Sequence, residues 1–145
     1  MPQTKYGHLI VTELKMPPEK HAIDKEYRKY ARRILWMDEN VVPGAFHMNT
    51  AWFHTAAKAL ENVPHVHEHD DEIIGFFGSN PDGPENLNAE VEIWIEDEMH
   101  LITRSAMLFI PAGLKHCPLI LRRVDRPIFH FTVVTGKQYI KKDQK

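Results

Sequence analysis

The sequence has little of what several classes of protein require. Cys117 is its single cysteine, so no disulfide can form within the chain, and we expect a reducing compartment, the cytoplasm. No stretch approaches ~18 consecutive apolar residues. The first residues also lack the basic segment and apolar core of a secretion signal. We therefore expect neither a membrane partner nor export.

An excess of charge of one sign is also missing. Lysine and arginine number 18 and aspartate and glutamate 20, which leaves a formal net charge of -2 at pH 7. Proteins that bind nucleic acid use a basic field that this composition does not supply, so we expect no nucleic-acid partner. A chain of 145 residues, 43% of them hydrophobic, can fold as one domain without a disulfide or a metal. A metal site would therefore need a functional explanation.

The first third of the chain predicts a strand followed by a helix. Residues 9–14 have the composition of a short strand, and Pro17-Pro18-Glu19 is typical of a helix start. Apolar residues then recur at three- and four-residue steps, as on one face of a helix. These residues are Ile23, Tyr27, Tyr30, Ala31 and Ile34. We expect residues 1–44 to pack outside a main body of residues 45–136, within the same domain, and residues 137–145 to form a polar tail.

Beyond Pro43-Gly44 the sequence predicts an all-β structure. Short runs rich in β-branched and aromatic residues alternate with turn formers, which favours a sandwich or a small barrel. The eight expected strands are residues 46–54, 63–67, 72–77, 90–95, 99–103, 106–110, 116–122 and 128–135. Residues 79–89 are rich in proline, glycine, asparagine and aspartate, and we interpret them as an exposed hairpin loop or an inserted lid.

The ten histidines include a pattern suited to a metal ion. Strand residues two apart project from the same face, so His65 and His67 can bind one ion together. Glu72 follows at the start of the next expected strand, and His116 follows a turn at Pro111-Ala112-Gly113. Three imidazoles and one carboxylate would bind a divalent ion.

These residues resemble the two motifs of the cupin superfamily, in the same order. His65, His67 and Glu72 match the HxH and glutamate of the first motif, and the second motif is matched by Pro111, Gly113 and His116. Some glycines and an asparagine of the motifs are replaced, but none of these changes touches a ligand. The departures are Ala59, Ser105 and Ile120, with Gly78 one residue early.

The resemblance covers about residues 46–134 and implies a fold, a ligand set and a partner. The implied fold is a double-stranded β-helix, the cupin jelly-roll barrel. The implied metal ligands are His65, His67, Glu72 and His116. Many cupins are dimers, so a homodimer is expected, and an exposed edge at residues 9–14 could pair with a second copy.

Several residues near the motifs keep alternative interpretations. His69 could be a fifth ligand or could replace Glu72, and Asp71 also lies at a permitted spacing, but Glu72 directly precedes the apolar run. His130 is a candidate acid/base if it faces the pocket, or an outer-face residue if it does not. Cys117 is expected on the face opposite His116, as a packed small hydrophobe. The histidines without a defensible ligand spacing are His8, His21, His47, His54 and His100.

The ligand set suggests a class of chemistry. Imidazole and carboxylate without thiolate suit Fe, Mn, Ni, Co, Cu or Zn. A divalent ion with three neutral histidines and one carboxylate carries a net charge of +1, which favours an anionic oxygen ligand. We expect a metal-dependent enzyme acting on a small oxygen-rich molecule, similar to cupin dioxygenases, isomerases and lyases. The alternative is a non-catalytic small-ligand-binding protein, a sensor or a storage protein.

Overall fold

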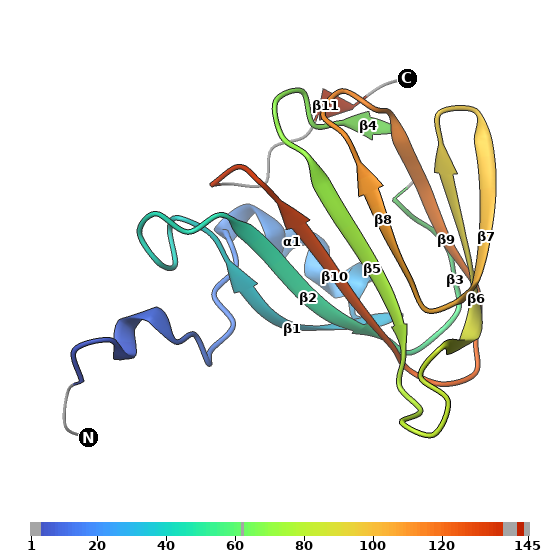
Figure 1. Ribbon diagram of the computed structural model, residues 1–145, viewed down its shortest axis with the longest axis horizontal. Helices are drawn as coiled ribbons and strands as arrows, with labels where there is room; N and C mark the ends of the chain where they lie inside the picture. Colours follow the sequence, from blue (N-terminus) through green and yellow to red (C-terminus); the bar gives the residue numbers. More distant parts are fainter. Residues whose placement is uncertain (1–3, 62, 138–141, 144–145) are drawn as a thin grey trace.

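The structure is a computed structural model that describes residues 4–61, 63–137 and 142–143. Two antiparallel sheets face each other and form a barrel (Figure 1). One sheet has the order β1-β2-β10-β5-β8, and the other has the order β11-β4-β9-β6-β7 with β3 beside β9. The strands are β1 (Ala31–Met37), β2 (His47–Phe53), β3 (Ala57–Glu61), β4 (His65–Val66), β5 (Glu72–Gly78), β6 (Asn86–Ile95), β7 (Glu98–Arg104), β8 (Ala106–Ile110), β9 (His116–Val124), β10 (Ile128–Val134) and β11 (Lys142–Asp143). The predicted all-β jelly-roll barrel is confirmed.

The core lies between the two sheets. Along β10 every second residue is buried, from Ile128 to Val134, as expected for a strand with one inward face. Fully burying a large apolar side chain stabilises the fold by about 1.5–3 kcal/mol, so these positions fix the register of each strand. The core includes Phe53, Ile74, Phe76, Leu87, Val91, Ile93, Ile110, Leu119, Leu121 and Ile128.

The predicted helix is present but shorter than expected. Helix α1 (Pro18–Tyr27) begins at the predicted proline pair, with Pro17 as its N-cap. Ala31 does not continue the helix, because β1 begins there and pairs with β2. The backbone N–H of His54 donates to the Tyr30 carbonyl at 2.8 Å, where the chain enters the sheet. Pairing with β2 therefore outweighs the helical periodicity, and β1 belongs to the barrel rather than outside it.

The predicted strand at residues 9–14 is wrong. A short 3-10 helix, η1 (Gly7–Leu9), precedes an irregular segment, and neither sheet pairs with it. Ile10 is 72% exposed, so the apolar side chains of this segment do not serve a buried face. The segment extends away from both sheets at the left of Figure 1. An intermolecular pairing through a strand at residues 9–14 loses its basis.

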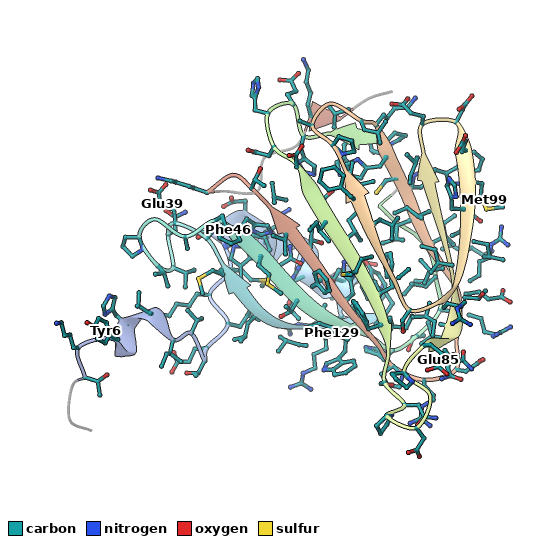
Figure 2. The ribbon with its side chains drawn as sticks, in the orientation of Figure 1. Tyr6, Glu39, Phe46, Glu85, Met99 and Phe129 are labelled. Atoms are coloured by element: carbon teal, nitrogen blue, oxygen red, sulfur yellow. The ribbon has the colours of Figure 1, made fainter. Side chains whose placement is uncertain are left out.

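The turn-rich segment after β5 is a loop at residues 79–85, shorter than predicted. Residues 86–89 already belong to β6, where Ala89 pairs with Val124. The loop follows the last residue of β5, whereas Glu72 is the first, so the loop lies at the opposite end of that strand. Glu85 lies in this loop at the bottom of Figure 2. The lid interpretation is therefore wrong for the histidine end of the barrel.

Candidate metal centre

Three histidines and a glutamate meet inside one end of the barrel. His65 in β4 pairs directly with His116 at the start of β9, and His67 follows two residues after His65. One ring nitrogen from each histidine lies within 4.8 Å of the others. Glu72 opens β5, and all four side chains are only 1–2% exposed. The structure thus brings the four sequence-predicted ligands together.

Backbone carbonyls orient two of the imidazoles. The Nδ1 of His65 lies 3.3 Å from the Val63 carbonyl oxygen, and the Nδ1 of His116 lies 3.0 Å from that of Leu114. A carbonyl only accepts, so each Nδ1 carries a hydrogen, and Nε2 is the nitrogen left to offer a lone pair when the ring is neutral. This is the arrangement by which proteins orient metal-binding histidines.

Glu72 supplies a carboxylate to the same point. Its Oε1 lies 2.8 Å from Nε2 of His116 and 3.4 Å from Nε2 of His67. Burial alone would raise the pKa of Glu72, but its interactions with His116 and His67 outweigh burial and lower the pKa to about 2. Glu72 is therefore a carboxylate at neutral pH.

The donor set fits a divalent transition metal. The three histidine nitrogens lie within 4.8 Å of one another, and Glu72 Oε1 lies beside two of them, His67 and His116, with no sulfur among these donors. Imidazole and carboxylate donors suit the metals from manganese to zinc.

The two alternative ligands that the sequence left open, Asp71 and His69, do not lie in the histidine cluster. The Asp71 carboxylate accepts a hydrogen bond from the backbone N–H of Ala112 at 2.9 Å, which ties the two motif segments together. The backbone N–H of Gly113 reinforces this link by donating to the His67 carbonyl at 2.8 Å. His69 is exposed and lies outside the histidine cluster. Asp71 therefore positions the turn, and Glu72 faces the cluster.

A bulge in β9 changes the face of Cys117. Ile95 pairs with His116 but Ile93 pairs with Leu119, so β9 carries one extra residue at this point. Cys117 has a backbone φ of 78°, and it is buried in the apolar core beside His116 rather than on the opposite face. The expected packing of Cys117 is observed, but the expected alternation is wrong.

A pocket of about 310 Å³ adjoins the cluster, and His130 lines it. The Nδ1 of His130 donates to the Gly75 carbonyl at 3.0 Å. The imidazole stacks against Phe53 at 4.5 Å and Phe76 at 5.1 Å between ring centroids. Of the two faces left open by the sequence, His130 takes the inner one.

Several residues near the cluster were not predicted from the sequence. His47, for which no role was expected, is fully buried in β2 and accepts a hydrogen bond at Nε2 from the Asn49 amide at 2.8 Å. Burial lowers the pKa of His47 to about 4. The alternation His47, Asn49, Ala51 along one strand was the signal for this face. The pocket-wall residues that the sequence did not predict include Lys20, Glu26, Tyr27, Tyr30, Arg33 and Trp36.

Several solved structures are similar to this one in fold. Oxalate oxidase in complex with glycolate is 15% identical with a TM-score of 0.56, over 93% of this chain and 63% of that chain. A conserved protein with a double-stranded β-helix domain from Klebsiella pneumoniae is 12% identical with a TM-score of 0.52, over 80% and 85%. No protein-family model and no curated protein matches the sequence. The likeness shows the cupin fold, and this chain spans less than two thirds of the oxalate oxidase chain.

No helix among the described residues is long and apolar enough to cross a membrane.

Proposed function

We propose that the chain binds one divalent transition metal through His65, His67, Glu72 and His116 and acts on a small oxygen-rich organic molecule. The supporting observation is the buried cluster of three imidazoles with Glu72 beside His67 and His116, in which backbone carbonyls set the tautomers of His65 and His116. A bound ion would supply a positive charge that polarises a substrate oxygen. The candidate metals are Fe, Mn, Ni, Co, Cu and Zn.

The proposed reaction is dioxygenase-, isomerase- or lyase-like. A pocket of about 310 Å³ lies at the small end of ligand sites, which span about 300–1,000 Å³. We propose His130 as the acid/base: its Nδ1 is engaged by the Gly75 carbonyl, so proton exchange with substrate falls to Nε2. The oxalate oxidase structure with glycolate shows that a related barrel accepts a small oxygenated acid, which supports this substrate class.

Elemental analysis of protein purified without a histidine tag tests the metal. We expect close to one equivalent of metal per chain, and its loss in a variant carrying His65→Ala and His116→Ala. The exposed histidines provide a matched control, a variant carrying His69→Ala and His100→Ala, which should keep the metal. A wild-type chain that binds no metal even after reconstitution would contradict the proposal.

Turnover assays separate the enzyme from a ligand-binding protein. Oxygen consumption with small oxygenated acids tests the dioxygenase-like reaction, and product analysis without oxygen consumption tests the isomerase- and lyase-like reactions. His130→Gln should lower the turnover rate by about 100-fold or more, within the usual contribution of a general acid/base. Tight binding of a small molecule with no turnover of that molecule would favour the sensor or storage alternative.

We also propose a homodimer in the cytoplasm, formed through the outer face of the β1-β2-β10-β5-β8 sheet. Met107 is 70% exposed and Phe109 62% exposed on the edge strand β8. Phe129, labelled in Figure 2, packs edge-on against Trp52 on the same outer face. Exposed apolar patches of this kind mark protein interfaces.

Analytical ultracentrifugation tests the dimer. Wild type should sediment as a dimer, and a variant carrying both Met107→Glu and Phe109→Glu should sediment as a monomer. A wild-type monomer at micromolar concentration would contradict the proposal.

A further inference from the structure

Arg33 brings a positive charge into the wall of the same pocket. Its side chain is only 10% exposed. The guanidinium carbon lies 4.1 Å from the ring centroid of Tyr27 and 5.8 Å from that of Trp36, so aromatic faces hold the group in place. A buried arginine needs a reason, because the side chain is almost always paired when it is withdrawn from water.

The contacts of Arg33 leave most of its donors unused. Its Nε lies 3.4 Å from Oδ1 of Asp24 without hydrogen-bond geometry, and the other oxygen of Asp24 accepts from Arg28 at 2.7 Å. Among the described residues, none accepts a hydrogen bond from the Arg33 guanidinium. A guanidinium carries five N–H donors in a planar fork, and of its nitrogens Nε is buried without a hydrogen bond. A ligand in the pocket would provide acceptors for this group.

Regular pairing with β2 places Arg33 on the pocket side, and a bulge in β1 follows it. Arg33 pairs with Ala51 but Trp36 pairs with Asn49, so β1 has three steps where β2 has two. Because of this extra residue, both Arg33 and Trp36 line the pocket, which strict alternation would forbid. Arg32, the next residue on the strand, is exposed. The fold therefore selects one of two neighbouring arginines for the interior.

The spacing suits a small molecule between Arg33 and the metal ligands. Across the sheet, Arg33 pairs with Ala51, which pairs with His130, whereas Glu72 pairs with Val134. Each set of paired residues forms one row across the strands. These rows are four residues apart along β10, about 13 Å at roughly 3.3 Å per residue. Arg33 and Glu72 nevertheless line one pocket, so a ligand held in it can face both side chains.

We propose that Arg33 binds the carboxylate of the substrate while a second oxygen of the same molecule faces the histidine cluster. This inference rests on the proposed function and narrows its substrate class to small carboxylic acids bearing another oxygen. The planar fork of arginine matches a carboxylate. A single guanidinium that already faces Asp24 suits a monoanion better than a phosphate dianion.

Calorimetric titration of the zinc-loaded protein with glycolate and with glycolamide tests the assignment. The two probes share a hydroxyl oxygen and differ in the carboxylate. We expect glycolate to bind wild type at least tenfold more tightly than glycolamide. Arg33→Met should weaken glycolate by about 10- to 100-fold, the range for losing a charge-assisted hydrogen bond, and should leave glycolamide unchanged. Arg33→Lys keeps the charge but loses the planar fork, so its affinity for glycolate should lie between those of wild type and Arg33→Met. Arg32→Met is the matched control and should bind glycolate as tightly as wild type.

Each outcome has a separate meaning. Equal affinity of wild type for glycolate and glycolamide, or an Arg33→Met variant that keeps wild-type glycolate affinity and zinc content, would overturn the role of Arg33 and leave the metal site standing. Methyl phosphate binding more tightly than glycolate would overturn the carboxylate assignment. If wild type fails to bind zinc or any other metal, the proposed function fails, and the glycolate preference of the metal-free protein still tests Arg33. Should Arg33→Met fail to fold, the loss of affinity in Arg33→Lys decides.

Discussion

The two ends of the pocket differ in how the sequence encodes them. At the end that holds the histidine cluster, the metal end, the proposed ligands lie in two short motifs, with His65 and His67 two residues apart and His116 three residues after Gly113. At the end that holds Arg33, the arginine end, α1, β1 and β2 each contribute wall residues, and β1 carries a bulge between Arg33 and Trp36. Local spacing is therefore enough to predict a set of ligands, whereas a pocket wall built from separate elements depends on how they pair.

The largest expected effect concerns the anchor of the arginine end. Trp36 is 3% exposed, donates from its indole N–H to Asp38 at 2.9 Å, and packs edge-on against His47. Trp36→Ala should lower the free energy of unfolding by about 3–5 kcal/mol, measured by urea denaturation. Trp52→Ala on the outer face, where the ring is 37% exposed, is the control and should cost clearly less. If folded Trp36→Ala protein keeps its metal, the two ends are independent.

The next effect separates two neighbouring acidic residues at the metal end. Glu72→Gln should weaken metal binding by more than about 100-fold, because even partners outside the ligand shell contribute about 10- to 100-fold. Asp71→Asn should change metal affinity less, because the Asp71 carboxylate accepts from the Ala112 backbone. Competition with a chelator of known affinity measures both variants. A greater loss in Asp71→Asn than in Glu72→Gln would show that the ligand assignment is wrong.

The buried His47 predicts a pH dependence of stability. Burial lowers its folded-state pKa to about 4 from an ordinary value of 6.5, so the folded state binds fewer protons there than the unfolded state. Its contribution is therefore fully present above pH 6.5 and is lost as the pH falls toward 4, by up to about 3 kcal/mol. Denaturation of metal-free protein across this range should show a shallower decline in His47→Gln than in wild type. Parallel pH profiles for the two proteins would contradict this prediction.

The smallest effect tests the turn that carries the second motif. Gly113 has a backbone φ of +84° with nothing within 4 Å of an added Cβ, so Gly113→Ala meets only backbone strain. We expect a loss of about 1–2 kcal/mol in unfolding free energy. Gly83 has similar open space but no positive φ, and Gly83→Ala should change stability by less than about 0.5 kcal/mol. Equal effects would mean that the turn is not what requires glycine at position 113.

Alternation and motif spacing were enough to predict the barrel, and they also named four residues that the structure places at one end of it. The sequence was not enough to predict the structure where pairing between distant segments determines it. Ala31 and Ile34 follow a helical period, yet both belong to β1, which pairs with β2. The bulge between Arg33 and Trp36 and the bulge at Cys117 each add one residue and change the facing of the residues beyond it. Pro118 is a local sign of the second bulge, whereas the position of the first depends on the partner strand.

The most direct test of the metal centre is anomalous diffraction from crystals of the tag-free, metal-loaded protein. We expect one strong peak inside the barrel, about 2.0–2.3 Å from a nitrogen of each of His65, His67 and His116 and from a Glu72 oxygen. A peak bound instead by His69 or Asp71, or crystals with metal only on the protein surface, would contradict it.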